Sequence, residues 1–362
     1  MLNRLFCAVL CVLWLAPIAW AWSAKEHILF TRLAAQRLID DPGTPDTMKA
    51  FLRQAMPNTF TPEQEQAFYM TARVGASKGD AQEKIEYWSI APDVFAASNK
   101  RDSVVEPFGV HERQMHFVDA EYFQADRKLG YKDDLSGKPG VKDIPRDMTD
   151  ARWPRAGMLP FAVEHSYRKL VESIRDNRLT TTGSKDVSTD DAVRWAGCLA
   201  HYVQDNTQPH HATIDYKSQS YFGDMRDPPN VHAEMEYRMV DDDSGDFVEL
   251  RTKYWPMFQE QLAVKDPEVS DDPWLATVEV ALYSYDALPL IGRAAAASKT
   301  EADPSTKKRA GVNTDAFFRF EGNFQGQKMT VLDMKAIQTA RAVKRTQLMW
   351  LKAWKEATGP KE

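Results

Sequence analysis

Apolar residues recur every three to four positions through most of the chain, and this spacing predicts a protein built from α-helices. Over residues 28–39, for example, Leu29 and Leu33 are one helical turn apart. The same pattern predicts helices over residues 47–52, 62–76, 158–175, 192–204, 231–240, 247–263, 272–297 and 329–354. Alternation typical of a strand is modest and confined to residues 109–118. We therefore expect an all-α fold.

Three polar segments that contain Pro or Gly interrupt the helical pattern, at residues 127–154, 216–230 and 298–327. The last of them is typical of an exposed insertion. The chain has no internal repeat and no segment with the composition of a linker. Residues 22–362 are therefore predicted to form a single compact multi-helix domain, which is long enough to bury a substantial core.

The first 21 residues differ from the rest of the chain. Arg4 precedes an apolar run over residues 5–18, and a small-x-small site ends at Ala21. This is the pattern of a secretory signal peptide, and the run is short for a membrane-spanning helix. We expect cleavage between Ala21 and Trp22, which gives a secreted or periplasmic protein. Two of the three cysteines are removed with this segment, so Cys198 has no disulfide partner.

The formal net charge is −6, which argues against a broad basic surface for nucleic acid. It does not exclude a substrate that carries phosphate, because bound metal ions are the largest local charges in a site.

Histidine is scarce, yet four of the eight histidines fall between residues 201 and 236. On a helix, residues four positions apart share a face, so His201 pairs with Asp205 and His232 pairs with Glu236. His211 lies between the two pairs. Imidazoles mixed with carboxylates, without thiolates, are typical of zinc in a hydrolytic site. The sequence therefore predicts a metal centre here.

Other candidate residues have weaker patterns. Asp93 follows a proline in an apolar setting, and on its own it would be interpreted as a turn residue. His111 and His116 are five positions apart rather than four, so they do not form a zinc-binding pair on a helix. His165 and His210 have no partner pattern, and we interpret them as structural or surface residues.

Taken together, these residues resemble the superfamily of zinc-dependent phospholipases C and single-strand-specific zinc nucleases. Its members begin the mature chain with Trp and share a His-x3-Asp-x5-His element followed by His-x3-Asp or His-x3-Glu. The residues that fit this element are His201, Asp205, His211, His232 and Glu236. The match extends from Trp22 to about Val240, and it implies the compact all-α fold of that superfamily with three zinc ions.

The resemblance implies a role for each matched residue. One zinc would be held by Asp93, His116, His201 and Asp205. A second would be held by Asp205, His27, and the α-amine and carbonyl of Trp22. The third would be held by His211, His232 and Glu236. Asp93 would also be the catalytic residue, orienting a zinc-activated hydroxide or accepting its proton.

Two substrate classes follow from the resemblance. Phe117 and Asp119 resemble the base pocket of the nucleases, in which an aromatic ring stacks on a base, although ordinary packing would also explain them. Glu236 is the phospholipase-like choice, and Ala96 stands where the nuclease pattern has Arg. We expect a nuclease that cleaves single-stranded DNA or RNA to 5′-phosphate products.

The alternative is a phospholipase C that acts on phosphatidylcholine-type lipids. A second alternative is a zinc-stabilised binding protein without catalysis, because metal ligands alone do not exclude it. No protein partner is inferred from the sequence.

Overall fold

The computed structural model describes residues 22–56, 60–71, 84–97, 109–132, 135–179, 191–241, 245–302, 305 and 309–360. The predicted signal peptide therefore lies outside the described residues. Within them the protein is an all-α fold, as predicted. The α-helices are α1 Ala24–Asp40, α2 Asp46–Ala55, α3 Pro62–Met70, α4 Ile85–Trp88, α5 Ala91–Ala96, α6 Trp153–Ala156, α7 Leu159–Arg175, α8 Ala192–Asp205, α9 Val231–Ala233, α10 Val248–Ala263, α11 Pro273–Tyr285, α12 Leu288–Ala297, α13 Thr314–Arg319 and α14 Val331–Thr358.

Short helical turns and two small hairpins complete the described structure. The 3₁₀ turns are η2 Glu112–Met115, η3 Ala120–Phe123, η4 Val141–Asp143, η5 Pro209–Ala212 and η6 Gln219–Phe222, and η7 Glu234–Arg238 is a π-helical turn. The antiparallel strand pairs are β1 Lys299–Thr300 with β2 Gly311–Val312, and β3 Glu321–Phe324 with β4 Gln327–Thr330.

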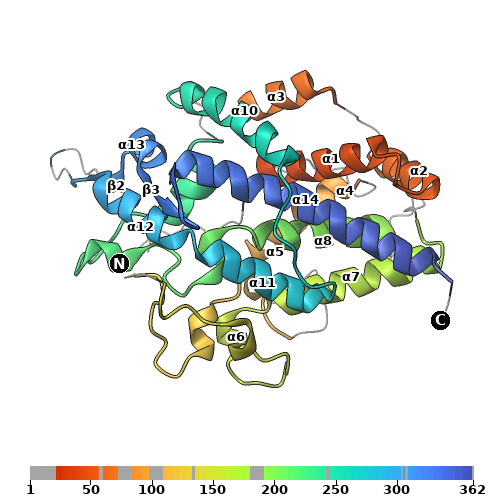
Figure 1. Ribbon diagram of the computed structural model, residues 1–362, viewed down its shortest axis with the longest axis horizontal. Helices are drawn as coiled ribbons and strands as arrows, with labels where there is room; N and C mark the ends of the chain where they lie inside the picture. Colours follow the sequence, from red (N-terminus) through yellow and green to blue (C-terminus); the bar gives the residue numbers. More distant parts are fainter. Residues whose placement is uncertain are drawn as a thin grey trace, which may run out of the picture.

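The longest helix, α14, forms the axis around which the other long helices pack. It contacts α1, α7, α8 and α10, and Figure 1 shows it crossing the middle of the molecule, with α1 and α10 on one side and α7 and α11 on the other. Its start is fixed by a capping box, in which the Thr330 hydroxyl accepts from the amide of Asp333 and the Asp333 carboxylate accepts from the amide of Thr330.

Helix α8 is the buried helix that carries His201 and Asp205. It begins at an N-cap, where the Asp191 side chain accepts a hydrogen bond from the amide of Val193. A Cβ atom at Gly197 would lie 2.3 Å from Cβ of Trp88, so only glycine lets α4 approach α8 this closely. As a result, the end of α4 lies against the histidine face of α8.

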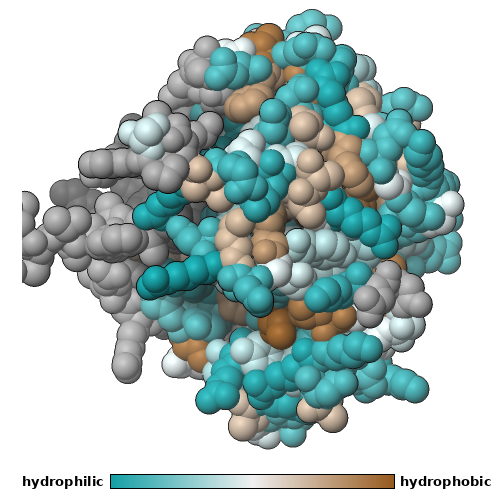
Figure 2. Space-filling model, turned by 90° about the vertical axis from the view of Figure 1, so that its left-hand side faces the viewer, coloured by the Kyte–Doolittle hydropathy of each residue, from teal (hydrophilic) through white to brown (hydrophobic). Residues whose placement is uncertain are grey.

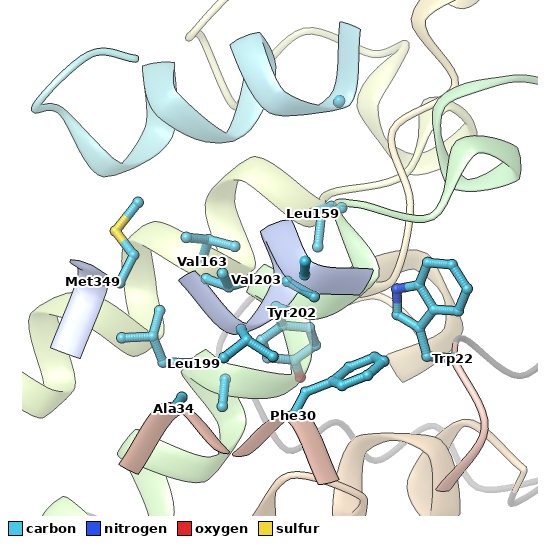
Figure 3. Packing of buried hydrophobic residues seen from close by; sticks show 14 of the residues in the cluster. Trp22, Phe30, Ala34, Leu159, Val163, Leu199, Tyr202, Val203 and Met349 are labelled. Atoms are coloured by element: carbon cyan, nitrogen blue, oxygen red, sulfur yellow. The ribbon is translucent and has the colours of Figure 1, made fainter. Parts of the chain in front are cut away.

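The core between α1, α8 and α14 consists of large apolar side chains. Figure 3 shows Phe30, Leu199 and Tyr202 packed between these helices, with Trp22 at one edge of the cluster. All four side chains are fully buried. The first described residue of the chain is therefore part of the hydrophobic core.

Three sequence-based predictions differ from the structure. Residues 272–297 form two helices rather than one, because Pro289 lacks an amide hydrogen and begins α12 instead of continuing α11. The strand predicted at residues 109–118 is wrong, since η2 occupies this segment. The segment 298–327 was predicted to be an exposed insertion, but among its described residues Ser298, Thr314, Phe317 and Phe324 are buried.

The surface in the view of Figure 2 is largely hydrophilic, with hydrophobic residues in small groups between polar ones. None of the helices in the described part of the chain combines the length and the apolar composition needed to cross a membrane.

His165 on α7 makes the stability of the fold depend on pH. Its ring packs edge-on against Trp195 of α8, with 5.4 Å between the ring centroids. Burial, followed by the charges of Arg168 and Lys169, lowers its pKa from 6.5 to about 4. Between these pH values the unfolded chain binds a proton that the folded chain does not, so folding stability falls as the pH drops from 6.5 towards 4.

The variant His165→Gln is expected to lose less stability than the wild type across this interval. Urea unfolding of both proteins at a series of pH values, with EDTA present throughout, measures the difference. The other titrating groups are common to the two proteins and cancel. Parallel stability curves for the two proteins would contradict the assignment.

Candidate metal centre

The histidines and carboxylates that the sequence singled out come together in three buried clusters within the described part of the chain. The clusters are His27 with His201 and Asp205; Asp93 with His116 and His201; and His211 with His232 and Glu236. In each cluster the possible ligand atoms lie within 4.8 Å of one another. The first two clusters share His201, so they form one continuous site.

Asp205, the last residue of α8, lies at the centre of the joined clusters. Its Oδ1 is 3.2 Å from Nε2 of His27 on α1. Its Oδ2 is 3.2 Å from Nε2 of His201, one turn earlier on α8, and 2.9 Å from Nδ1 of His116 after η2. The two oxygens of this single carboxylate therefore face opposite parts of the site.

The imidazole rings are oriented by acceptors on their outer sides. Nδ1 of His27 donates to Oε1 of Gln204, and Nδ1 of His201 donates to the carbonyl of Ser89, each over 2.7 Å. With the proton held on the outer nitrogen, each ring can present the lone pair of its inner nitrogen to a metal ion in the cluster.

A metal ion fits this arrangement. Nε2 of His27 and Oδ1 of Asp205 are both buried without a hydrogen-bond donor, and they face each other as two acceptors. Ligand atoms about 2.0–2.1 Å from a tetrahedral zinc lie roughly 3.3 Å apart, which is close to the separations found around Asp205. A cation between these atoms satisfies both of them, whereas acceptors alone would repel.

Asp93 and His116 complete the joined site from outside α8. Oδ1 of Asp93 lies 3.7 Å from Nδ1 of His116 and 3.9 Å from Nε2 of His201, and Oδ2 of Asp93 is buried without a hydrogen-bond partner. On the outer side of the His116 ring, the buried carboxylate of Glu112 lies 3.7 Å from Nε2 and accepts a hydrogen bond from Tyr202. A carboxylate behind a histidine in this way is a common support for a metal ligand.

The electrostatics of the joined site favour positive charge. Burial opposes ionisation of Asp205, but His201 and the other two imidazoles outweigh it and hold the pKa of Asp205 well below its usual value. Burial also opposes protonation of His201, yet the charges of Asp205 and Asp93 raise its pKa to about 9. The same carboxylate field that stabilises a proton here would stabilise a metal cation.

The third cluster joins His211 of η5, His232 of α9 and Glu236 of the π-helical turn η7. Asn230 caps the start of α9 by accepting a hydrogen bond from the amide of Ala233. Nε2 of His232 contacts Oε1 of Glu236, which is 3.6 Å from Nε2 of His211. Both ring nitrogens of His232 are buried without a hydrogen-bond partner.

Burial lowers the pKa of His211 to about 4, and it lowers that of His232 well below the usual value. Both rings are therefore neutral at physiological pH, which is the state in which imidazole binds zinc.

Two fully buried lysines hold this π-helical segment against the N-terminal helix. Lys335 on α14 donates to the carbonyl of Met235 over 2.5 Å and pairs with Glu26 on α1 at 2.9 Å. Lys25 donates over 2.6 Å to the carbonyl of Val240, just beyond the turn. The segment that carries Glu236 is thus anchored to the same residues that precede His27.

Replacing Lys335 with methionine is expected to destabilise the fold by about 3–5 kcal/mol, because it leaves Glu26 as an unpaired buried carboxylate. The double variant Glu26→Gln, Lys335→Met should recover much of this loss. Urea unfolding measures both, with Lys328→Met as a control at an exposed lysine of β4. If Lys335→Met is as stable as Lys328→Met, the ion pair between Lys335 and Glu26 does not contribute to the free energy of unfolding.

Trp22 lies beside the joined clusters. Its indole nitrogen donates over 2.9 Å to the carbonyl of Gln204, the residue before Asp205. The Lys335 ammonium lies 4.6 Å from the centre of the indole ring. These contacts fix the start of the predicted mature chain next to Asp205.

A pocket of about 400 Å³ opens over His116, His211 and His232 of the clusters. Its lining consists of Ala96, Arg113, His116, Phe117, Asp119, Tyr122, His210, His211, Ile214, Tyr216, Lys217, Asn230 and His232. The structure thus places Phe117 and Asp119, which the sequence predicted to contact substrate, in the same pocket as His116.

The backbone at Gly157 packs closely against Phe117, since a Cβ atom at Gly157 would lie 2.1 Å from the Phe117 carbonyl oxygen. Burial, reinforced by Glu121, raises the pKa of Asp119 well above its usual value.

Several residues of the site were not found from the sequence. Glu112 is four positions before His116, and this spacing was an available signal. His210 was interpreted as structural or surface, and it is buried in the wall of the pocket with Nε2 3.0 Å from the Ser218 hydroxyl. No local pattern marks Lys335, because its partners are about a hundred or more positions away in the sequence.

Comparisons with known proteins give little beyond this geometry. No protein-family model matches the chain, and no curated protein sequence matches it significantly. Among solved structures, the alpha-toxin of Clostridium perfringens from an avian strain is similar at 12% sequence identity and a TM-score of 0.41. The match covers 95% of this chain and 66% of the toxin, so the chain spans about two thirds of the length of that structure. A likeness of this size carries no argument about function, which has to come from the site.

Proposed function

We propose that the protein is a zinc-dependent hydrolase of phosphodiester bonds. The observation that carries this proposal is the buried carboxylate of Asp205, whose two oxygens face three imidazole nitrogens at 2.9–3.2 Å. Nε2 of His27 and Oδ1 of Asp205 lack a donor, so the arrangement is poorly satisfied without a cation.

Three zinc ions match the three clusters, with Trp22 added to the cluster of His27 once its α-amine is free. When bound, zinc supplies Lewis acidity towards the phosphoryl oxygens and lowers the pKa of a bound water. The protein contributes neutral imidazoles, a central carboxylate and outer acceptors that keep each ring in one orientation. Gln204, Ser89 and Glu112 supply this outer support.

Asp93 is the proposed catalytic residue. Its Oδ1 faces His116 and His201, while its Oδ2 has no hydrogen-bond partner within the described structure. This second oxygen is free to orient the attacking water and to accept its proton. The variant Asp93→Asn keeps the shape of the side chain but removes its negative charge and its ability to accept a proton, so it separates this role from packing.

Single-stranded nucleic acid is the first candidate substrate, hydrolysed to 5′-phosphate products. Phe117 and Asp119 lie in the pocket beside His116, where an aromatic ring stacks on a base and a carboxyl group hydrogen-bonds to the edge of that base. Phosphatidylcholine-type lipid is the second candidate, since aromatic side chains with a carboxylate also bind quaternary ammonium groups.

The test uses the chain that begins at Trp22, loaded with zinc, against three substrates: bis(p-nitrophenyl) phosphate, oligothymidylate and phosphatidylcholine vesicles. EDTA should abolish hydrolysis and added zinc should restore it. Metal content is measured by mass spectrometry on the same samples.

Each outcome has a distinct meaning. Release of 5′-mononucleotides supports the nuclease, and release of phosphocholine supports the phospholipase. A protein that holds its zinc but hydrolyses none of the three substrates would overturn the proposal in favour of a zinc-stabilised binding protein. If Asp93→Asn is as active as the wild type, the role given to Asp93 is wrong.

We also propose that the chain is exported, to the periplasm or the medium, with cleavage between Ala21 and Trp22. The apolar run and the small-x-small site before Trp22 support this. N-terminal sequencing of the protein from its own host would test it, and a chain that begins upstream of Trp22 would contradict it.

A further inference from the structure

The mouth of the pocket is lined by cations, although the protein as a whole is acidic. Arg113 on η2 and Lys217 after η5 both line the pocket, and Asp119 is the only carboxylate residue among its described lining residues. The net charge of the whole chain is −6. Positive charge is therefore concentrated at this opening, where it would attract anionic groups.

Two cations at or next to the pocket, Lys217 and Arg127, each lie close to an aromatic ring of its lining. The Lys217 ammonium lies 5.4 Å from the ring centre of Tyr216, and the Arg127 guanidinium lies 4.8 Å from that of Tyr122. Both tyrosines line the pocket, and Tyr216 is 44% exposed. Aromatic platforms with neighbouring cations are the combination that binds single-stranded nucleic acid, through base stacking and phosphate contacts.

The same pairs disfavour a choline headgroup. A quaternary ammonium ion binds on the face of an aromatic ring. In this pocket a protein cation already lies within cation–π distance of the Tyr122 and Tyr216 rings, so it would compete with and repel a second cation there. The residues around the pocket opening therefore favour a ligand in which anionic groups lie next to planar rings.

The segment that carries Tyr216 and Lys217 is held in place before any ligand binds. Asp215 accepts hydrogen bonds from the Tyr131 hydroxyl over 2.5 Å and from the amide of Gln219 over 2.6 Å. Glu121 accepts from the amide of Ile214 on the preceding side. A segment fixed in this way loses little entropy when it binds a ligand.

We propose that Arg113 and Lys217 bind phosphates that flank the scissile one, so the preferred substrate is a strand with several consecutive phosphodiesters. The inference rests on the proposed phosphodiesterase function and deepens it. A substrate with a single phosphodiester has no flanking phosphate to offer these cations once that phosphodiester is held by the metal-binding residues. Binding through phosphates is independent of base sequence, because it contacts the backbone alone.

The experiment measures binding of a fluorescent phosphorothioate oligothymidylate to the zinc-loaded protein by anisotropy, over a range of salt concentrations. For a single strand the slope of log K against log salt is about −0.7 per neutralised phosphate. Arg113→Gln and Lys217→Gln should each flatten the slope by about 0.7, and the double variant by about 1.4. The exposed Lys328→Gln serves as the matched control, since Lys328 does not line the pocket.

A second readout compares kcat/KM for oligothymidylate with kcat/KM for bis(p-nitrophenyl) phosphate, which has one phosphodiester. Each pocket variant should lower this ratio, and the Lys328→Gln control should not. The loss should be the same with oligodeoxyadenylate, as expected for backbone contacts.

Slopes of the pocket variants equal to that of Lys328→Gln would overturn the inference. Hydrolysis of bis(p-nitrophenyl) phosphate or phosphatidylcholine without binding of the oligonucleotide would also overturn it, while leaving the phosphodiesterase function intact. If the zinc-loaded protein hydrolyses no phosphodiester, the proposed function fails first, and this outcome is distinguishable from the other two.

Discussion

Replacing Asp205 with asparagine is expected to release metal from the two joined clusters and to abolish hydrolysis. The carboxylate contacts His27, His116 and His201, so its loss affects both clusters at once. Loss of an outer partner of a metal ligand already costs roughly 10–100-fold in metal affinity, and loss of a shared ligand should cost more. The third cluster, which includes Glu236, lacks Asp205 and should keep its ion.

Metal content per chain is the measurement that tests this prediction, because it is independent of turnover. The expected change is from three zinc ions to one. Asp286→Asn provides the control, since this carboxylate pairs with Lys138 and belongs to none of the three clusters. Circular dichroism shows whether the helices are retained. A folded Asp205→Asn protein with unchanged zinc content would show that Asp205 is not a ligand.

An additional residue before Trp22 is expected to remove one zinc ion and most of the activity. A free α-amine has a lone pair for the metal, whereas the amide nitrogen of an extended chain does not. The indole is anchored to Gln204 and Thr207 and is fully buried, so the main chain cannot shift to compensate. The α-amine of Trp22 is therefore predicted to be as necessary for zinc binding as a ligand side chain is.

The comparison is between the chain that begins at Trp22 and the same chain with one preceding glycine. Removing the glycine with an aminopeptidase should restore the lost zinc ion, which is the one assigned to Trp22 and His27, and the activity in the same sample. Equal zinc content and activity in the native and extended proteins would eliminate the α-amine as a ligand. The predicted fold of the extended protein is unchanged, since the indole contacts do not need a free amine.

The helices, and the two pairs of candidate ligands spaced four residues apart, could be predicted from the sequence. The start of α8 at Ala192 follows from the capping side chain of Asp191, and its end at Asp205 follows from the proline that begins η5. The pairing of His201 with Asp205 follows from the helical repeat alone. Pro289 was a signal that residues 272–297 form two helices. The apolar periodicity continues across this proline, so the sequence analysis predicted a single helix.

The residues implied only by the resemblance needed the fold to bring them together. Asp93 and His116 lie on different segments, and nothing in their local sequence indicates that both face His201. The close packing of α4 on α8 at Gly197 places the Ser89 carbonyl behind His201. Helical periodicity reports which face of a segment is buried, but it does not report which other segment covers that face.

By itself, the sequence determined the all-α fold and the spacing of the ligand pairs, because these depend on the repeat of the helix and on local capping. The tertiary structure alone decided that Lys25 and Lys335 are buried, that η7 is a π-helical turn, and that Arg113 shares a pocket with Lys217. Contacts of this kind join residues far apart in the chain. Their free energy depends on the burial and charge of neighbours that only the packed fold supplies.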